Sequence, residues 1–461
     1  MGETLSLSRP SFNRSVHVES RESHLSGDCG AILVREGIER TGLIDGLSAR
    51  LLDPRDPRRV THPLSELVRD ALIMTAQGWG DQSDATHLRE EPLFALTGSD
   101  RRGQAAAERT LASQSSFSRL LSMLSTPANH KALQAATIEL AGRRLRAENR
   151  GYKRSTLTID IDGVPLRAHG QQSGTAYSGH THQRQHYPLL ASCAETGDHL
   201  GALLRTGAAG PAELAATWIP QLVREAREHL SDHIRVRIDA GFADGQTLNA
   251  LDAEGIEFIA RLPSNRKLER LFEPHRCRGP GRPSSEPREW LVEATHQAST
   301  WAAEHRVVIV VQEHPEELFR RCFFLVTNMP EHRASGEFVL EHYRRRGKAE
   351  GHFGEFKTVL GESLPCTTQR QRRSPEEVFA RAQALLSLRV IAYEILHVLR
   401  GEVERMTGTG WSLARVRERL LKVAGRVRFH ARCIQIDVER RAAAYWNRLM
   451  GRLAKLQPLP G

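Results

Sequence analysis

The segment YRRRGKAEGHFGEFK, residues 343–357, carries the side chains whose types and spacing best suit chemistry. Tyr343, Arg346, Glu350 and Lys357 stand at offsets of 0, 3, 7 and 14 residues. At about 100° per residue, a helix would gather all four on one stripe. A carboxylate flanked by cations suits a metal ion held beside a phosphate backbone, because the acid can bind the metal and the bases can bind the phosphates. The alternative interpretation is a solvated, salt-bridged surface helix.

Two aspartates far upstream extend this pattern, since each is predicted to end a β-strand beside a glycine. Asp162 closes an alternating polar and apolar run, 156–162, and Asp239 closes a second extended run, 234–239. Strand ends of an α/β sheet face the crevice where such folds place their sites. With Glu350 they make three acidic oxygen ligands, which suit Mg²⁺ or Mn²⁺ rather than zinc. Two such ions, about 4 Å apart, would activate a water and stabilise the leaving oxygen in phosphodiester cleavage.

Each aspartate also has a plainer interpretation. An aspartate at a strand end is more often a cap or turn residue than a ligand. Asp160 lies on the same strand face as Asp162 and competes for the role, although Asp162 is nearer the strand end. Arg235 and Arg237 share the face of Asp239 and could simply pair with it.

The elements that must position these residues follow from the hydrophobic pattern. Helical periodicity dominates before residue 150, strands alternate with helices after it, and basic helical sequence follows residue 373. The pattern predicts an α/β fold flanked by helical regions. The expected units are a disordered tail, 1–24; a helical N-terminal domain, 25–150; a first core part, 151–263; a β-rich insertion, 264–335; a final core helix, 336–372; and a basic helical region, 373–461.

Charge and composition narrow the class of partner. The whole chain has a formal net charge of +10, and residues 371–461 hold 18 Lys and Arg against 8 Asp and Glu, so this part carries the entire excess. Such a basic face favours a polyanion, with nucleic acid ahead of a membrane. No signal core is seen, and the six cysteines are too scattered for a zinc site or a disulfide framework. We therefore expect a cytoplasmic protein that does not bind a membrane.

Several motifs together resemble one known family. Tyr-x2-Arg-x3-Glu-x6-Lys resembles the YREK signature of DDE transposases from bacterial insertion sequences. Further motifs are similar to one subgroup, the insertion sequences numbered thirteen-eighty: the Asp162 strand with HGQQ at 169–172 and YPLL at 187–190, IDAGF at 238–242, AQGWGDQSD at 76–84, and LASQS at 111–115. The resemblance covers about residues 28–450.

The resemblance implies an RNase H-like catalytic core with a β-rich insertion between the second Asp and the Glu. Asp162, Asp239 and Glu350 would hold two Mg²⁺ or Mn²⁺ ions, and Tyr343, Arg346 and Lys357 would contact phosphates near the cleaved end. The N-terminal domain would bind terminal inverted repeats. The partner would be double-stranded DNA, as transposon ends and target, bound by a homodimer in the bacterial cytoplasm near the nucleoid. A metal-dependent nuclease and a non-catalytic DNA-binding protein derived from a transposase are the alternatives.

The sequence departs from the family pattern in two places. Gly347, Gly351 and Gly354 lie inside the expected helix, where each costs about 1 kcal/mol relative to alanine. Gly163 and Val164 follow Asp162 where relatives commonly have a threonine nearby, which leaves Asp160 open as the first acid. Family members also place an aromatic residue of the insertion against a flipped base at a hairpinned DNA end. Trp290 and Trp301 are the candidates, and a core role is at least as common for tryptophan.

Overall fold

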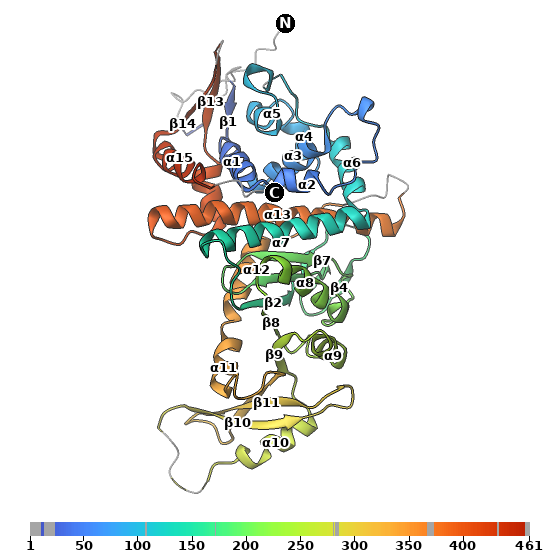
Figure 1. Cartoon of the computed structure of the whole chain (residues 1–461), viewed down its shortest axis with the longest axis vertical. Helices are drawn as coiled ribbons and strands as arrows, with labels where there is room; N and C mark the ends of the chain where they lie inside the picture. Colours follow the sequence, from blue (N-terminus) through green and yellow to red (C-terminus); the bar gives the residue numbers. More distant parts are fainter. Residues whose placement is uncertain are drawn as a thin grey trace.

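The computed structural model describes residues 11–12, 24–106, 108–170, 172–279, 281, 285–366, 373–430 and 433–456. The predicted tail, 1–24, and Gln171 of the first motif fall wholly or mainly outside this part. Figure 1 shows an elongated molecule, with a helical region at the top, two long helices across the middle, and a sheet whose last strands form the lower end.

The helices predicted before residue 150 are confirmed. Ser113 and Thr126 cap the last two, each accepting a hydrogen bond from a backbone amide three residues on, as N-cap side chains do. The α-helices are α1 Ala31–Thr41, α2 Leu43–Ser48, α3 Leu64–Gln77, α4 Asp84–His87, α5 Pro92–Gly98, α6 Gln114–Leu124 and α7 Pro127–Glu148, with short 3₁₀ turns at Pro57–Arg59 and Gly103–Ala106.

The longest helix, α13 (Pro375–Thr407), crosses the middle of the molecule below the N-terminal helices. It packs against α1, α3, α6 and α7 and also against the sheet strand β7 (His199–Leu203). Within the described ranges it is the one helix long and apolar enough to cross a membrane, yet 94% of its apolar window is buried inside the protein. A helix that is apolar all round is a core helix when neighbours cover it. The apolar core of the N-terminal helices is therefore continuous with that of the C-terminal part.

A mixed sheet of eight strands forms the lower half, in the order β10-β11-β12-β9-β8-β2-β6-β7. β2, β8 and β9 are parallel, and the remaining neighbours are antiparallel. The extended runs predicted at 156–162 and 234–239 are confirmed as strands. The bounds are β2 Leu157–Gly163, β6 Leu189–Cys193, β8 Ile234–Ile238, β9 Glu257–Leu262, β10 Arg288–His296, β11 His305–Glu313 and β12 Arg321–Thr327.

The central strands have one apolar and one polar face. Leu157, Ile159 and Ile161 of β2 point into a core that also includes side chains of α8 (Ala215–His229) and α9 (Gly245–Ala253). Since successive strand residues point to opposite faces, Asp160 and Asp162 lie on the other side. The remaining elements here are β3 Leu166–Arg167, β4 Ala176–Ser178 and β5 Gln183–His186, which form a small separate sheet, and α10 Arg266–Arg276.

The prediction of a wholly helical C-terminal region is wrong for 425–438. Those residues form an antiparallel hairpin of β13 (Gly425–His430) and β14 (Cys433–Val438), to which β1 (Leu25–Ser26) adds at the edge. Val427 of β13 is buried between exposed arginines, which is the period-two pattern of a strand. The other elements are α14 Leu413–Val416, a π-helical turn Arg417–Leu421 and α15 Arg440–Leu453.

Candidate active site

The parallel pairing of β2 with β8 brings the two predicted aspartates to the same end of the sheet. Asp160 of β2 is the register partner of Arg237 in β8. Two residues further along each chain, on the same face, stand Asp162 and Asp239. Asp162 accepts a hydrogen bond from the Gly163 amide at 2.8 Å, and Asp239 accepts one from the amide two residues on at 2.9 Å. Both carboxylates are thus held by short turns at strand ends.

The segment that carries Glu350 is two helices rather than the single helix expected. α11 (Gly336–Arg344) and α12 (Gly347–Leu360) meet at Arg345 and Arg346. At this junction the backbone amides bond to the carbonyl three residues earlier, instead of four residues earlier as in an α-helix. Arg237 of β8 contributes to this joint by donating a hydrogen bond to the carbonyl oxygen of His342 in the last turn of α11. The four-residue stripe is therefore interrupted after Tyr343, whereas Arg346 and Glu350 stay one turn apart.

Arg346 brings the three predicted acids together. Its Nη2 lies 2.9 Å from Asp162 Oδ2 and 4.0 Å from Asp239 Oδ2, and its Nη1 lies 3.2 Å from Glu350 Oε1. The exposed fraction of the side chain rises from 10% for Arg346 to 22% for Asp162, 38% for Asp239 and 65% for Glu350. Acids from three distant parts of the chain thus surround a single guanidinium, and their exposure to solvent increases from Asp162 to Glu350.

The electrostatics of this cluster follow from burial and from the charges within it. Burial raises the pKa of the Asp162 carboxyl, and nearby Asp239 adds to the increase while Arg346 opposes it. Burial works against the charge of Arg346, but the carboxylates of Asp162 and Asp239 outweigh it and raise the pKa of the guanidinium. The excess of negative charge at this point attracts cations.

Asp160, the competing first acid, forms its ion pair with Arg237 rather than with Arg346. Its two oxygens accept hydrogen bonds from Arg237 at 2.5 and 2.7 Å, and the side chains are 1% and 2% exposed. Arg235 pairs instead with Glu257 at 3.0 Å, on the adjacent strand. The interpretation in which these arginines pair with Asp239 is therefore wrong, because the register places each beside a different carboxylate.

The remaining predicted residues lie around the cluster rather than in it. Tyr343 is half-buried on α11, beside an apolar group that includes Val339, and it bonds to Arg261. Burial raises the pKa of its phenol. Lys357 is half-exposed two turns beyond Glu350 on α12, and no ion pair reaches it among the described residues.

Tyr187 and Arg205, which lie near Asp162, were not among the predicted site residues. A side-chain carbon on Gly163 would stand 2.5 Å from the Tyr187 hydroxyl, so only glycine lets this ring pack against the strand. The guanidinium of Arg205 lies 5.0 Å from the centre of the Tyr187 ring. Tyr187 begins the YPLL motif seen in the sequence, but its contact with Gly163 depends on the tertiary arrangement of the strands.

The donor chemistry of the cluster fits a hard divalent cation. Three carboxylates supply the oxygen ligands that Mg²⁺ and Mn²⁺ prefer. In the described ranges, however, no three His, Cys, Asp or Glu side chains are close enough to share one ion. In this cluster the acids face the guanidinium of Arg346, which stands between them. The acids are therefore of the right chemical type for such an ion, but Arg346 now occupies the position between them.

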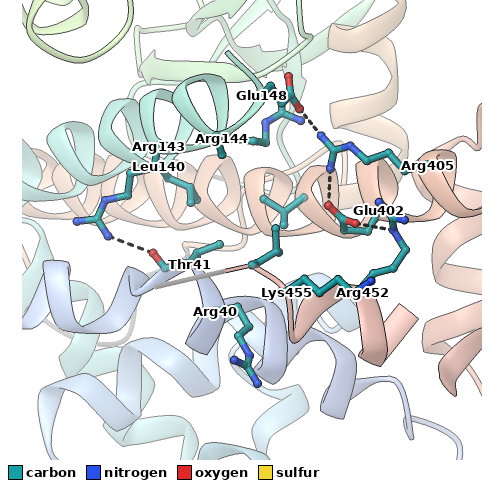
Figure 2. A pocket seen from close by; sticks show the side chains of 14 residues that line it. Arg40, Thr41, Leu140, Arg143, Arg144, Glu148, Glu402, Arg405, Arg452 and Lys455 are labelled. Carbon is teal, nitrogen blue, oxygen red and sulfur yellow. Dashed lines mark hydrogen bonds and ion pairs between the residues drawn. The ribbon is translucent and has the colours of Figure 1, made fainter. Parts of the chain in front are cut away.

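A pocket of about 550 Å³ lies where α1, α7, α13 and α15 meet (Figure 2). Two of its arginines pair with acids: Arg405 bonds to Glu402 and to Glu148, and Arg452 bonds to Glu402 at 2.8 Å. None of its lining residues belongs to the acidic cluster. These ion pairs join helices from distant parts of the chain, so we interpret the pocket as part of the packing between helices.

The family described as "Transposase DDE domain group 1" matches residues 8–460 of the chain. The chain belongs to the DDE transposase family. The protein is thus a transposase enzyme of a family that generally uses divalent metal ions.

Other comparisons of the transposase add little. No curated protein matches it. A cryo-EM structure of a piggyBac transposase synaptic complex with hairpin DNA is similar at 10% identity and a TM-score of 0.37, over 79% of this chain and 75% of that one. At that score the likeness carries no argument.

The two tryptophans considered for base stacking are both engaged within the transposase. Trp301 is 7% exposed, within the core behind the sheet. Trp290 is half-buried on β10, and the guanidinium of Arg320 lies 4.8 Å from its ring centre. Trp301 is thus a core residue.

Proposed function

We propose that Asp162, Asp239 and Glu350 are the catalytic acids of this DDE transposase and that they hold two divalent ions, Mg²⁺ or Mn²⁺. One observation carries the proposal. Carboxylates from β2, from the end of β8 and from α12 all face the single guanidinium of Arg346, although they are separated by 77 and 111 residues in sequence. One carboxylate would be enough to neutralise a buried arginine, so the presence of three partly exposed acids around Arg346 favours a functional role.

The reaction proposed is hydrolysis of the phosphodiester at each transposon end, followed by joining of the 3′-hydroxyl to target DNA. The bound ions would activate the attacking water and stabilise the leaving oxygen. Asp162 and Asp239 stand at strand ends and give the site a rigid side, whereas Glu350, the most exposed, stands on a helix. Arg346, Tyr343 and Lys357 would contact phosphates beside the cleaved bond.

The outer side of α12 supports close approach of DNA. Gly347, Gly351 and Gly354 follow one another at helical spacing, and no atom lies within 4 Å of the position that a side-chain carbon would take on any of them. The absence of side chains leaves the backbone of the helix accessible next to Glu350. A phosphate backbone could therefore lie against α12 without displacing other groups.

The wider architecture proposed is that of an insertion-sequence transposase. β7, β6, β2, β8 and β9 would form an RNase H-like core, extended by the insertion strands β12, β11 and β10. The helices of 25–150 would bind terminal inverted repeats, and a homodimer would pair two ends. We place the protein in the YREK branch, in the subgroup numbered thirteen-eighty, and in the bacterial cytoplasm near the nucleoid, away from membranes.

The test uses duplexes that cover the DNA on both sides of the gene, with Mg²⁺ and the variant Asp239→Asn. The variant should bind these ends like the original protein and lose cleavage. The matched control is Asp232→Asn, because that carboxylate is 77% exposed and pairs only with Lys153 at 3.0 Å. Cleavage retained by Asp239→Asn would remove that residue from the site.

Two outcomes would favour the alternatives. Cleavage without strand-transfer products from pre-cut ends would indicate a nuclease. End binding with no Mg²⁺-dependent chemistry in the unmodified protein would indicate a DNA-binding protein that has lost catalysis.

A further inference from the structure

We propose that Arg346 is a built-in counter-cation of the acidic cluster, which keeps the acids together before metal binds and withdraws to a DNA phosphate when the ions enter. The inference rests on the proposed function, because it takes Asp162, Asp239 and Glu350 as the ligands. It makes Arg346 a positioning residue that couples DNA binding to metal binding.

The position of the guanidinium carries the argument. Nη2 lies 2.9 Å from Oδ2 of Asp162 and 4.0 Å from Oδ2 of Asp239, so a cation held by both carboxylates would compete with that nitrogen for the same oxygens. Two cations at such separation repel each other strongly in a partly buried site. Arg346 and a bridging ion therefore exclude one another.

The same charges explain why the acids can gather without metal. Asp162 and Asp239 would repel each other if no cation stood between them, and Arg346 supplies one within hydrogen-bonding reach of Asp162 and of Glu350. A guanidinium stays protonated in proteins, so this counter-charge is permanent. With one positive charge against three negative charges, the cluster keeps a net attraction for divalent ions.

Arg346 is buried, and one side of it faces backbone that carries no side chains. Its Nε is buried without a hydrogen-bond partner. The residue stands at the joint between α11 and α12, followed by Gly347, beside which no atom lies within 4 Å of the side-chain position. Rotation of this side chain toward Gly347 would break its bonds to Asp162 and Glu350 and bring the guanidinium beside the exposed glycines of α12.

DNA supplies the second partner. A guanidinium binds a phosphate through two parallel hydrogen bonds, which compensates for the bonds lost to the acids. DNA that draws Arg346 away should therefore increase the affinity of the acids for metal, and metal should increase the affinity for DNA by the same factor.

The experiment measures Mn²⁺ binding to the full-length, metal-free protein from the electron paramagnetic resonance signal of the free ion, with and without an end duplex. Arg346→Gln should bind Mn²⁺ about tenfold or more tightly than the original protein without DNA, because one charge-assisted competitor is gone. DNA should raise the affinity of the original protein and leave that of the variant nearly unchanged. The matched control is Arg345→Gln, whose arginine pairs with Glu341 outside the cluster and should behave like the original.

Each outcome decides a separate point. Unchanged or weaker Mn²⁺ binding by Arg346→Gln would overturn the inference, as would a crystal structure with Mn²⁺ in which Arg346 still bonds to Asp162. If Arg346→Gln does not fold, Arg346→Lys replaces it and should show a smaller gain, since a shorter ammonium reaches fewer carboxylates. Failure of Asp239→Asn to weaken Mn²⁺ binding would instead overturn the proposed function, because the acids would then not be the ligands.

Discussion

Replacing Asp160 by asparagine separates a structural acid from the acids of the candidate site. The side chain accepts two hydrogen bonds from Arg237, and both partners are almost fully buried. Removing one charge of such a pair leaves the other uncompensated, which costs about 3–5 kcal/mol. Asparagine keeps one acceptor oxygen, so we expect Asp160→Asn to lower the stability of this region by about 3 kcal/mol, the lower end of that range.

The assay is native-state hydrogen exchange of peptides from β2 and β8, because exchange reports the local free energy of opening. Asp232→Asn is the comparison, since an exposed ion pair contributes about 1 kcal/mol or less. The double variant Asp160→Leu, Arg237→Met should lose less than the single one, because no buried charge remains. It should not recover fully, since Arg237 also bonds to the carbonyl of His342.

Two results would refute this reasoning. Exchange in Asp160→Asn equal to that of the original protein would mean that the buried pair contributes no net stability. Loss of Mn²⁺ binding in a folded Asp160→Asn, with binding retained in Asp162→Asn, would make Asp160 the first acid.

Three other changes test the structure. Gly163→Ala should push against the ring of Tyr187, cost about 1–3 kcal/mol and slow end cleavage, as measured by melting and by rate. Burial and the carboxylate of Asp198 raise the pKa of Glu394, so the folded state binds this proton more tightly than the unfolded state. The folded state therefore loses stability as pH rises through that pKa. The melting temperature of Glu394→Gln should accordingly increase relative to that of the original protein as pH increases. Arg441→Gln on the exposed side of α15 should reduce the slope of log affinity against log salt by about 0.9 if that arginine contacts a phosphate of end DNA.

Some errors of sequence reasoning have clear physical causes. The break between α11 and α12 depends on Arg237, which comes from a strand about 100 residues upstream and bonds to the end of α11. Local spacing therefore predicts one helix where tertiary contact makes two. The hairpin of 425–438 was missed for a different reason, since its alternating pattern was present but was weighed less than the basic helical sequence around it.

The amino-acid sequence by itself determined which elements form around the site and which acids are available, because strand alternation and glycine-terminated strand ends are local properties of the chain. It also contained the spacing of Arg346 and Glu350, which survives as an ion pair in the structure. Only the tertiary structure shows that the two aspartates have different partners, Arg237 for Asp160 and Arg346 for Asp162. Those residues share a strand face, and the parallel register alone places Arg237 beside the first and leaves the second at the open end of the sheet.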